Sequence, residues 1–128
     1  MDITINFSSE KARKRRINYL DISIGTPMKN KFTISSLSWL RERGEKSVED
    51  FEPMSLKNSE YGILKNHKLN IQNKSIQQLI SDLTPFVYIY GGQNGILFER
   101  ECQNLALCTR HPKLQEILDT LAKLVKLV

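Results

Sequence analysis

Five cations near the start of the chain are the residues whose type and spacing most clearly suggest chemistry. They fill five of six consecutive positions, as Lys11, Arg13, Lys14, Arg15 and Arg16. Arginine forks match phosphate geometry, and clustered cations gain affinity for a polyanion by releasing its counterions. The run therefore predicts an anion-binding site, with nucleic acid as the first choice of ligand. The alternatives are acidic protein surface, anionic lipid, a nuclear localisation signal and a solvated basic segment.

A second charged segment has the opposite sign. Five carboxylates and two cations lie within residues 42–52. The basic and acidic segments could face each other, within one molecule or between copies. Such pairing would neutralise part of the basic run and favour a protein partner over nucleic acid. The formal net charge of +5 suits a polyanionic ligand but also serves solubility alone.

The C-terminal segment has apolar residues at helical spacing, and this stripe is the second feature with functional information. Steps of three and four predict an amphipathic helix whose last turn holds Lys123 and Lys126, where the helix dipole favours cations. The stripe suits packing on the sheet, and its width also suits pairing with a partner helix or a second copy. The predicted partner interface consists of Leu114, Ile117, Leu118, Leu121, Leu124, Val125 and Val128.

Signatures of catalysis are incomplete. Gly91-Gly92-Gln93 matches the tripeptide that class I peptide-release factors use in peptidyl-tRNA hydrolysis, a resemblance of three residues. It lies between two apolar strands, where turn residues are needed, and so predicts a hairpin turn. His67 and His111 show no metal-ligand spacing to a cysteine, and no phosphate-binding glycine loop leads into a helix. We therefore expect no enzyme activity, no metal and no cofactor.

The two cysteines do not form a disulfide scaffold. Cys102 and Cys108 have five residues between them, and an extended chain would hold them too far apart for a bridge, whereas a turn could bring them together. No cationic segment followed by an apolar run marks a signal peptide, and no apolar run approaches membrane-spanning length. The expectation is an intracellular, cytoplasmic protein, with nuclear entry as an alternative in a eukaryotic host.

Alternation and turn residues predict the elements that must position these groups. Residues 3–7 and 17–24 alternate as strands, residues 86–90 and 96–100 form a hairpin, and helices are expected near 36–43, 75–83 and 113–128. Segment 8–16 is expected as a basic arm or short helix, and 45–60 as an acidic loop. Residues 61–72 are expected to contain a further strand.

The fold prediction is one α+β domain spanning 1–128. It has a small antiparallel sheet of about four to five strands centred on the hairpin 86–100, and two or three helices, the longest C-terminal.

Three functions compete. The first is a non-catalytic protein that binds a polyanion through the basic run and associates with itself through the last helix. The second is a regulatory or structural subunit, of a virus or mobile element, whose basic run meets acidic protein surface. The third is a small hydrolase built from Cys102, Cys108, His67, His111 and Glu99.

Overall fold

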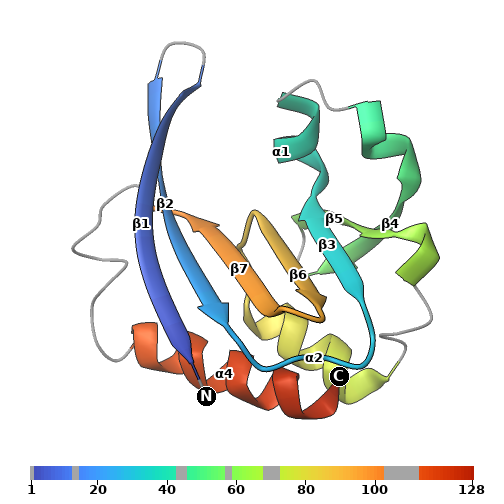
Figure 1. Cartoon of the computed structure of the whole chain (residues 1–128). Helices are drawn as coiled ribbons and strands as arrows, with labels where there is room; N and C mark the ends of the chain where they lie inside the picture. Colours follow the sequence, from blue (N-terminus) through green and yellow to red (C-terminus); the bar gives the residue numbers. More distant parts are fainter. Residues whose placement is uncertain (1, 13–14, 43–45, 57–58, 68–72, 103–112) are drawn as a thin grey trace.

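The computed structural model describes residues 2–12, 15–42, 46–56, 59–67, 73–102 and 113–128. Its centre is a seven-stranded antiparallel sheet with the order β1-β2-β7-β6-β3-β5-β4 (Figure 1). The strands are β1 (Ile3–Ala12), β2 (Arg15–Ile24), β3 (Phe32–Ser36), β4 (Phe51–Leu56), β5 (Ser59–Leu64), β6 (Tyr88–Gly92) and β7 (Gly95–Glu101). The helices are α1 (Leu37–Glu42), the 3-10 helix η1 (Lys46–Asp50), α2 (Lys74–Asp82) and α4 (Lys113–Leu127). The α+β prediction with the longest helix last is confirmed, and the sheet is larger than expected.

The first hairpin corrects the prediction of a basic helix. β1 and β2 are ten residues each and pair in register from Ile3 opposite Ile24 to Ala12 opposite Arg15. Lys11, Arg15 and Arg16 thus continue the two strands, because each gains a cross-strand partner that a helix over 8–16 would lose. Helix propensity of lysine and arginine is a weak preference, and tertiary pairing overrides it.

The predicted central hairpin is confirmed. Counted from β1, β7 is the third strand and β6 the fourth of the seven, so the hairpin lies at the middle of the sheet. Only Gln93 and Asn94 lie between the paired Gly92 and Gly95. Gly95 has φ +104°, and a Cβ there would collide with the backbone of Ile24. Glycine is the residue that adopts this conformation without steric cost, so the turn explains the glycine-rich segment.

The segment predicted as an acidic loop holds η1, β4 and the start of β5, so this prediction is wrong. Pro53 lies in β4, which is an edge strand and therefore tolerates a residue without an N–H group. A Cβ at Gly62 of β5 would meet the side chains of Leu37 and Phe51. Glycine at this position lets α1 and the start of β4 close onto the same face of the sheet.

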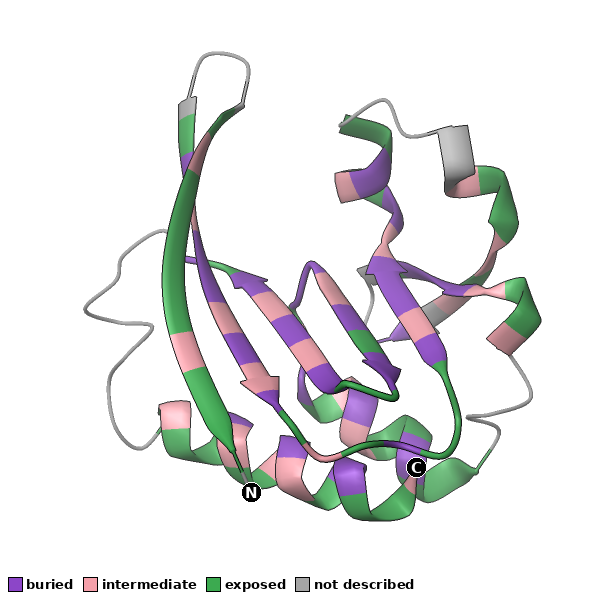
Figure 2. Ribbon diagram, in the orientation of Figure 1, coloured by how far each residue is buried: buried purple, intermediate pink, exposed green. Residues whose placement is uncertain are grey.

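Two helices cover the other face. α2 and α4 pack against each other beneath the strands (Figure 1), and buried and less buried residues alternate along β2 and β7 (Figure 2). Asn73 caps α2 by accepting hydrogen bonds from the backbone N–H groups of Ser75 and Ile76. In the part of the chain that the structure describes, no helix is long and apolar enough to cross a membrane.

Candidate functional site

The basic run occupies the far end of the β1–β2 ribbon. Lys11 lies directly opposite Arg16, and Arg15 ends the paired segment opposite Ala12, whereas Arg13 and Lys14 lie outside the described residues. β2 pairs with β7 from Tyr19 onward, and the Cys102 backbone N–H donates to the Asn18 carbonyl, so the three residues Arg15–Ile17 extend past the neighbouring strand. With about 3.3 Å per residue, the ribbon end extends past the neighbouring strand by about 10 Å. The fold therefore presents these cations at a protruding edge of the sheet.

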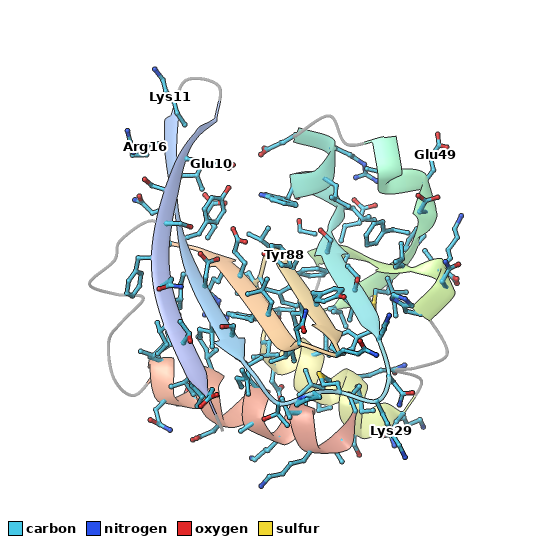
Figure 3. All side chains as sticks on the ribbon, in the orientation of Figure 1. Glu10, Lys11, Arg16, Lys29, Glu49 and Tyr88 are labelled. Atoms are coloured by element: carbon cyan, nitrogen blue, oxygen red, sulfur yellow. The ribbon has the colours of Figure 1, made fainter. Side chains whose placement is uncertain are left out.

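One face of the ribbon combines an aromatic ring with cations. Phe7, Ser9 and Lys11 alternate onto the same face of β1, and Arg16 joins them from β2 because residues directly opposite share a face. The Arg16 Nη1 donates a hydrogen bond to the Ser9 Oγ at 3.0 Å. Phe7 is 46% exposed although its ring is apolar. Figure 3 shows Lys11 and Arg16 on the outer side of the ribbon and Glu10 on the side toward α1.

The inner face of the ribbon is braced against α1. The Tyr19 hydroxyl donates to the Glu10 Oε1 at 3.0 Å, and the Trp39 Nε1 donates to the Tyr19 oxygen at 3.4 Å. The ring centroids of Trp39 and Tyr88 are 6.1 Å apart. Buried Ile17 and Tyr19 form a second apolar cluster with these side chains. The base of the ribbon is thus fixed to the body of the protein, which holds its outer face in a defined orientation.

The inner face is also acidic. Glu10, Asp21 and Glu99 lie on three adjacent strands with the same side-chain phase. Burial, the charge of Glu99, a hydrogen bond to Glu99 and the charge of Asp21 raise the pKa of Tyr88 well above its usual value. Asp21 in turn accepts a hydrogen bond from the Ser8 hydroxyl at 3.0 Å. The ribbon therefore separates a cationic outer face from an anionic inner face.

Glu49, Asp50 and Glu52 of the acidic segment lie across the molecule from Lys11 and Arg16. β1 and β4 are the two opposite edges of the sheet, and Figure 3 shows Glu49 on the side away from Lys11 and Arg16. Among the described residues, Arg41 of α1 pairs with Glu60 of β5 at 2.9 Å, and this contact lowers the pKa of the Glu60 carboxyl. Sheet order thus favours pairing of the two segments between molecules over pairing within one.

The apolar stripe of α4 faces the protein's own core. Ile117, Leu121, Leu124 and Val125 are buried, and Leu114, Leu118 and Val128 are partly buried and pack on the same cluster. Leu127, which the sequence prediction did not include, is the half-exposed apolar residue of this helix. The width of the stripe is explained by two neighbours, because α4 contacts both the sheet and α2. Self-association through these seven residues stays a prediction that the packing does not require.

The residues considered for hydrolysis are not assembled by the described part of the chain. Cys102 is buried in the core and is disulfide-bonded, while Cys108 and His111 lie outside the described residues. Glu99 forms a hydrogen bond with Tyr88 on the face of the sheet opposite Cys102. The buried His67 Nδ1 makes no hydrogen bond to a described residue. No group of histidine, cysteine or carboxylate side chains among the described residues could hold a metal ion.

Sequence reasoning missed one polar residue in the core. Arg100 of β7 is 8% exposed and follows Ile96 and Phe98 in the strand phase that faces the helices. This phase was readable from the alternation of residues 96–100, because a cation in an inward position is unusual.

Comparison of the chain with protein-family models, with curated proteins and with solved structures found no significant match.

Proposed function

We propose that this chain is a non-catalytic nucleic-acid-binding protein that uses the outer face of the β1–β2 ribbon end. The observation that carries the proposal is the shared face of Phe7, Lys11 and Arg16 at the protruding end of a run with five cations in six positions. Cations neutralise phosphates, and an exposed aromatic ring farther along the same face offers a stacking surface to a base. This combination supports a single-stranded ligand.

The alternative ligand is acidic protein surface, and the aromatic ring argues against it. Poly-glutamate and a nucleic acid both supply negative charge, but only the nucleic acid supplies bases that can stack on Phe7. A two-stranded ribbon can also enter the major groove of a duplex. Duplex binding would use the cations but not the Phe7 ring, so the two ligands differ in whether Phe7 contributes to affinity. Self-association through α4 is not part of this proposal, because four of the seven stripe residues are buried.

Fluorescence anisotropy with labelled single-stranded RNA, single-stranded DNA and duplex DNA tests the proposal. Replacing Lys11, Arg13, Lys14, Arg15 and Arg16 together by alanine should weaken binding of single strands about 100-fold at low salt, because the cations that neutralise phosphates at the ribbon end are lost. The matched control removes exposed cations from α4 by Lys113→Ala, Lys123→Ala and Lys126→Ala, and it should leave affinity within about threefold.

Two outcomes would overturn the proposal. One is equal loss of affinity in the α4 control, which would mean that overall charge and not the ribbon binds the ligand. The other is binding of poly-glutamate as tight as binding of RNA, together with no effect of Phe7→Ala on either ligand. Circular dichroism of each variant establishes that it is folded.

A further inference from the structure

Arg100 places a positive charge in the interior of the protein, against neutral backbone carbonyls. Its Nε donates to the Pro85 carbonyl and its Nη2 donates to the Leu83 carbonyl, both at 2.8 Å. The guanidinium also lies 5.8 Å from the centre of the Phe98 ring. Within the described part of the chain, no carboxylate contacts it. Burial lowers the pKa of Arg100, yet a guanidinium stays protonated in proteins. Neutral carbonyls satisfy two donors but leave the charge uncompensated, which is costly in a low-dielectric site.

This guanidinium forms part of a cleft. The cleft has a volume of about 710 Å³, within the range typical of small-molecule sites. It lies beside the start of β6 and the end of β7, where α1 closes over the sheet. Its lining includes the apolar and aromatic residues Trp39, Tyr61, Pro85, Phe86 and Val87 together with Arg100. Its polar rim consists of Ser36, Ser38, Glu42, Glu60 and Glu101. Arg100 and Pro85 also line a smaller cavity of about 240 Å³, so the guanidinium lies between two hollow regions.

A second buried donor also lines the cleft. The Tyr61 hydroxyl accepts a hydrogen bond from the Phe86 backbone N–H at 3.2 Å, which leaves its own proton available to donate. Tyr61 is 2% exposed, and its ring stacks on Phe86 with centroids 4.6 Å apart. Tyr61 is also near enough to affect Arg100 electrostatically. The Arg100 Nη1 makes no hydrogen bond to a described residue, so two donors near aromatic rings remain for an acceptor.

We propose that this cleft binds a small carboxylate with an aromatic body, its carboxylate on Arg100 and Tyr61 and its ring against Trp39 and Phe86. A carboxylate accepts both donors and brings one negative charge, which matches the single uncompensated guanidinium. The cleft is also lined by Glu42 and Glu101, and by Glu60, which pairs with Arg41, so acidic lining opposes the two charges of a phosphate more than the one charge of a carboxylate. The same rim attracts an ammonium group, so an aromatic amino acid should bind at least as well as the simple acid. This site is separate from the ribbon, and the proposal does not depend on nucleic-acid binding.

Trp39 is the single tryptophan of the chain and lines the cleft, so its fluorescence reports on occupancy. Titration with 3-phenylpropionate should change this fluorescence saturably, with a dissociation constant below about 1 mM. Phenylalanine should bind with similar or higher affinity, whereas phenethylamine and inorganic phosphate should bind at least about tenfold more weakly. Calorimetry with the same compounds checks that the optical signal reflects binding.

Variants locate the site. Arg100→Lys keeps the charge but loses the fork and should weaken 3-phenylpropionate at least about tenfold. Ser38→Phe, at an exposed rim position, should block the cleft without touching Arg100, and Ser75→Phe on exposed α2 is its matched control. Glu42→Gln should raise the affinity for 3-phenylpropionate and lower the affinity for phenethylamine, each by about twofold to threefold.

The proposal is overturned if folded wild-type protein does not bind 3-phenylpropionate, or if phenethylamine binds more tightly than the acid. It is also overturned if Ser38→Phe and Ser75→Phe bind the acid equally well. Because Ser38→Phe leaves Arg100 and its carbonyl partners intact, this last test holds even if the Arg100 variants do not fold.

Discussion

Arg16 and Arg100 carry the same side chain in opposite surroundings. Arg16 is exposed at the ribbon end, bonded to a serine hydroxyl and adjacent in sequence to other cations. Arg100 is buried, bonded to two backbone carbonyls, and lies on the wall of a cleft. Water and salt screen an exposed charge, so Arg16 attracts an anion strongly only together with the neighbouring cations. A buried charge is screened little, so Arg100 acts alone, at contact distance and with a defined direction.

Salt should separate the two sites most strongly. With up to five phosphates neutralised by the basic run, affinity for single-stranded RNA should fall by as much as about 100-fold between about 50 mM and 200 mM salt. Binding of 3-phenylpropionate at Arg100 should change less than about threefold over the same range, because one partly buried contact releases few ions. Parallel titrations by anisotropy and by Trp39 fluorescence measure both. A steep salt dependence of the carboxylate would place that ligand on the protein surface.

The second largest difference between Arg16 and Arg100 should be their contribution to the free energy of unfolding. Arg100→Met removes the donors to the carbonyls of Leu83 and Pro85 and should lower the free energy of unfolding by about 2 kcal/mol. Arg16→Met, which loses one exposed contact, should change it by less than about 0.5 kcal/mol. Urea denaturation followed by circular dichroism provides the comparison. Similar losses in the two variants would show that Arg100 has no structural role beyond that of an exposed arginine.

A ring substitution distinguishes stacking from charge at the ribbon. Phe7→Ala should weaken single-stranded RNA about tenfold, since stacking on one aromatic ring contributes this much in comparable sites. The slope of affinity against salt should stay unchanged, because no cation is removed. Anisotropy at several salt concentrations measures both quantities, and Ile3→Ala is the control for loss of an exposed apolar side chain on the same strand. Equal effects of the two substitutions would remove stacking from the proposal.

The smallest expected effect concerns pH. The folded state raises the pKa of Tyr88, so it keeps the hydroxyl proton at a pH where the unfolded chain loses it, from about 10 upward. The protonated Tyr88 therefore contributes its full share of the free energy of unfolding below pH about 10, and this contribution is lost as the pH rises further. Tyr88→Phe should lose less stability than wild type between pH about 9 and 10.5 in urea denaturation. Tyr90→Phe, on the same strand, controls for loss of a tyrosine hydroxyl. An identical pH profile of wild type and Tyr88→Phe would contradict the assignment.

Patterns confined to one element were readable without the structure. The spacing of Leu121 and Val125 gave the last helix, and the glycines around Gln93 gave the central hairpin, because each depends on contacts a few residues apart. The same reasoning failed for the basic run, where strand and helix both fit a stretch of cations. The pairing of the end of β1 with the start of β2 decided the question in favour of strand, and this pairing is a contact between two segments.

The sequence by itself determined where the charge lies, which segments have one apolar face, and that the last helix is the longest. Tertiary structure alone decided which groups meet. The sheet order put the acidic segment on the edge opposite the basic run, and the strand register put Phe7 on the same face as Arg16. Long-range packing also brought Arg100 to the carbonyls of Leu83 and Pro85 and near Tyr61, which come from other segments of the chain. The physical reason is that periodicity fixes a side chain's face within its own element, whereas the partner of that face depends on long-range packing.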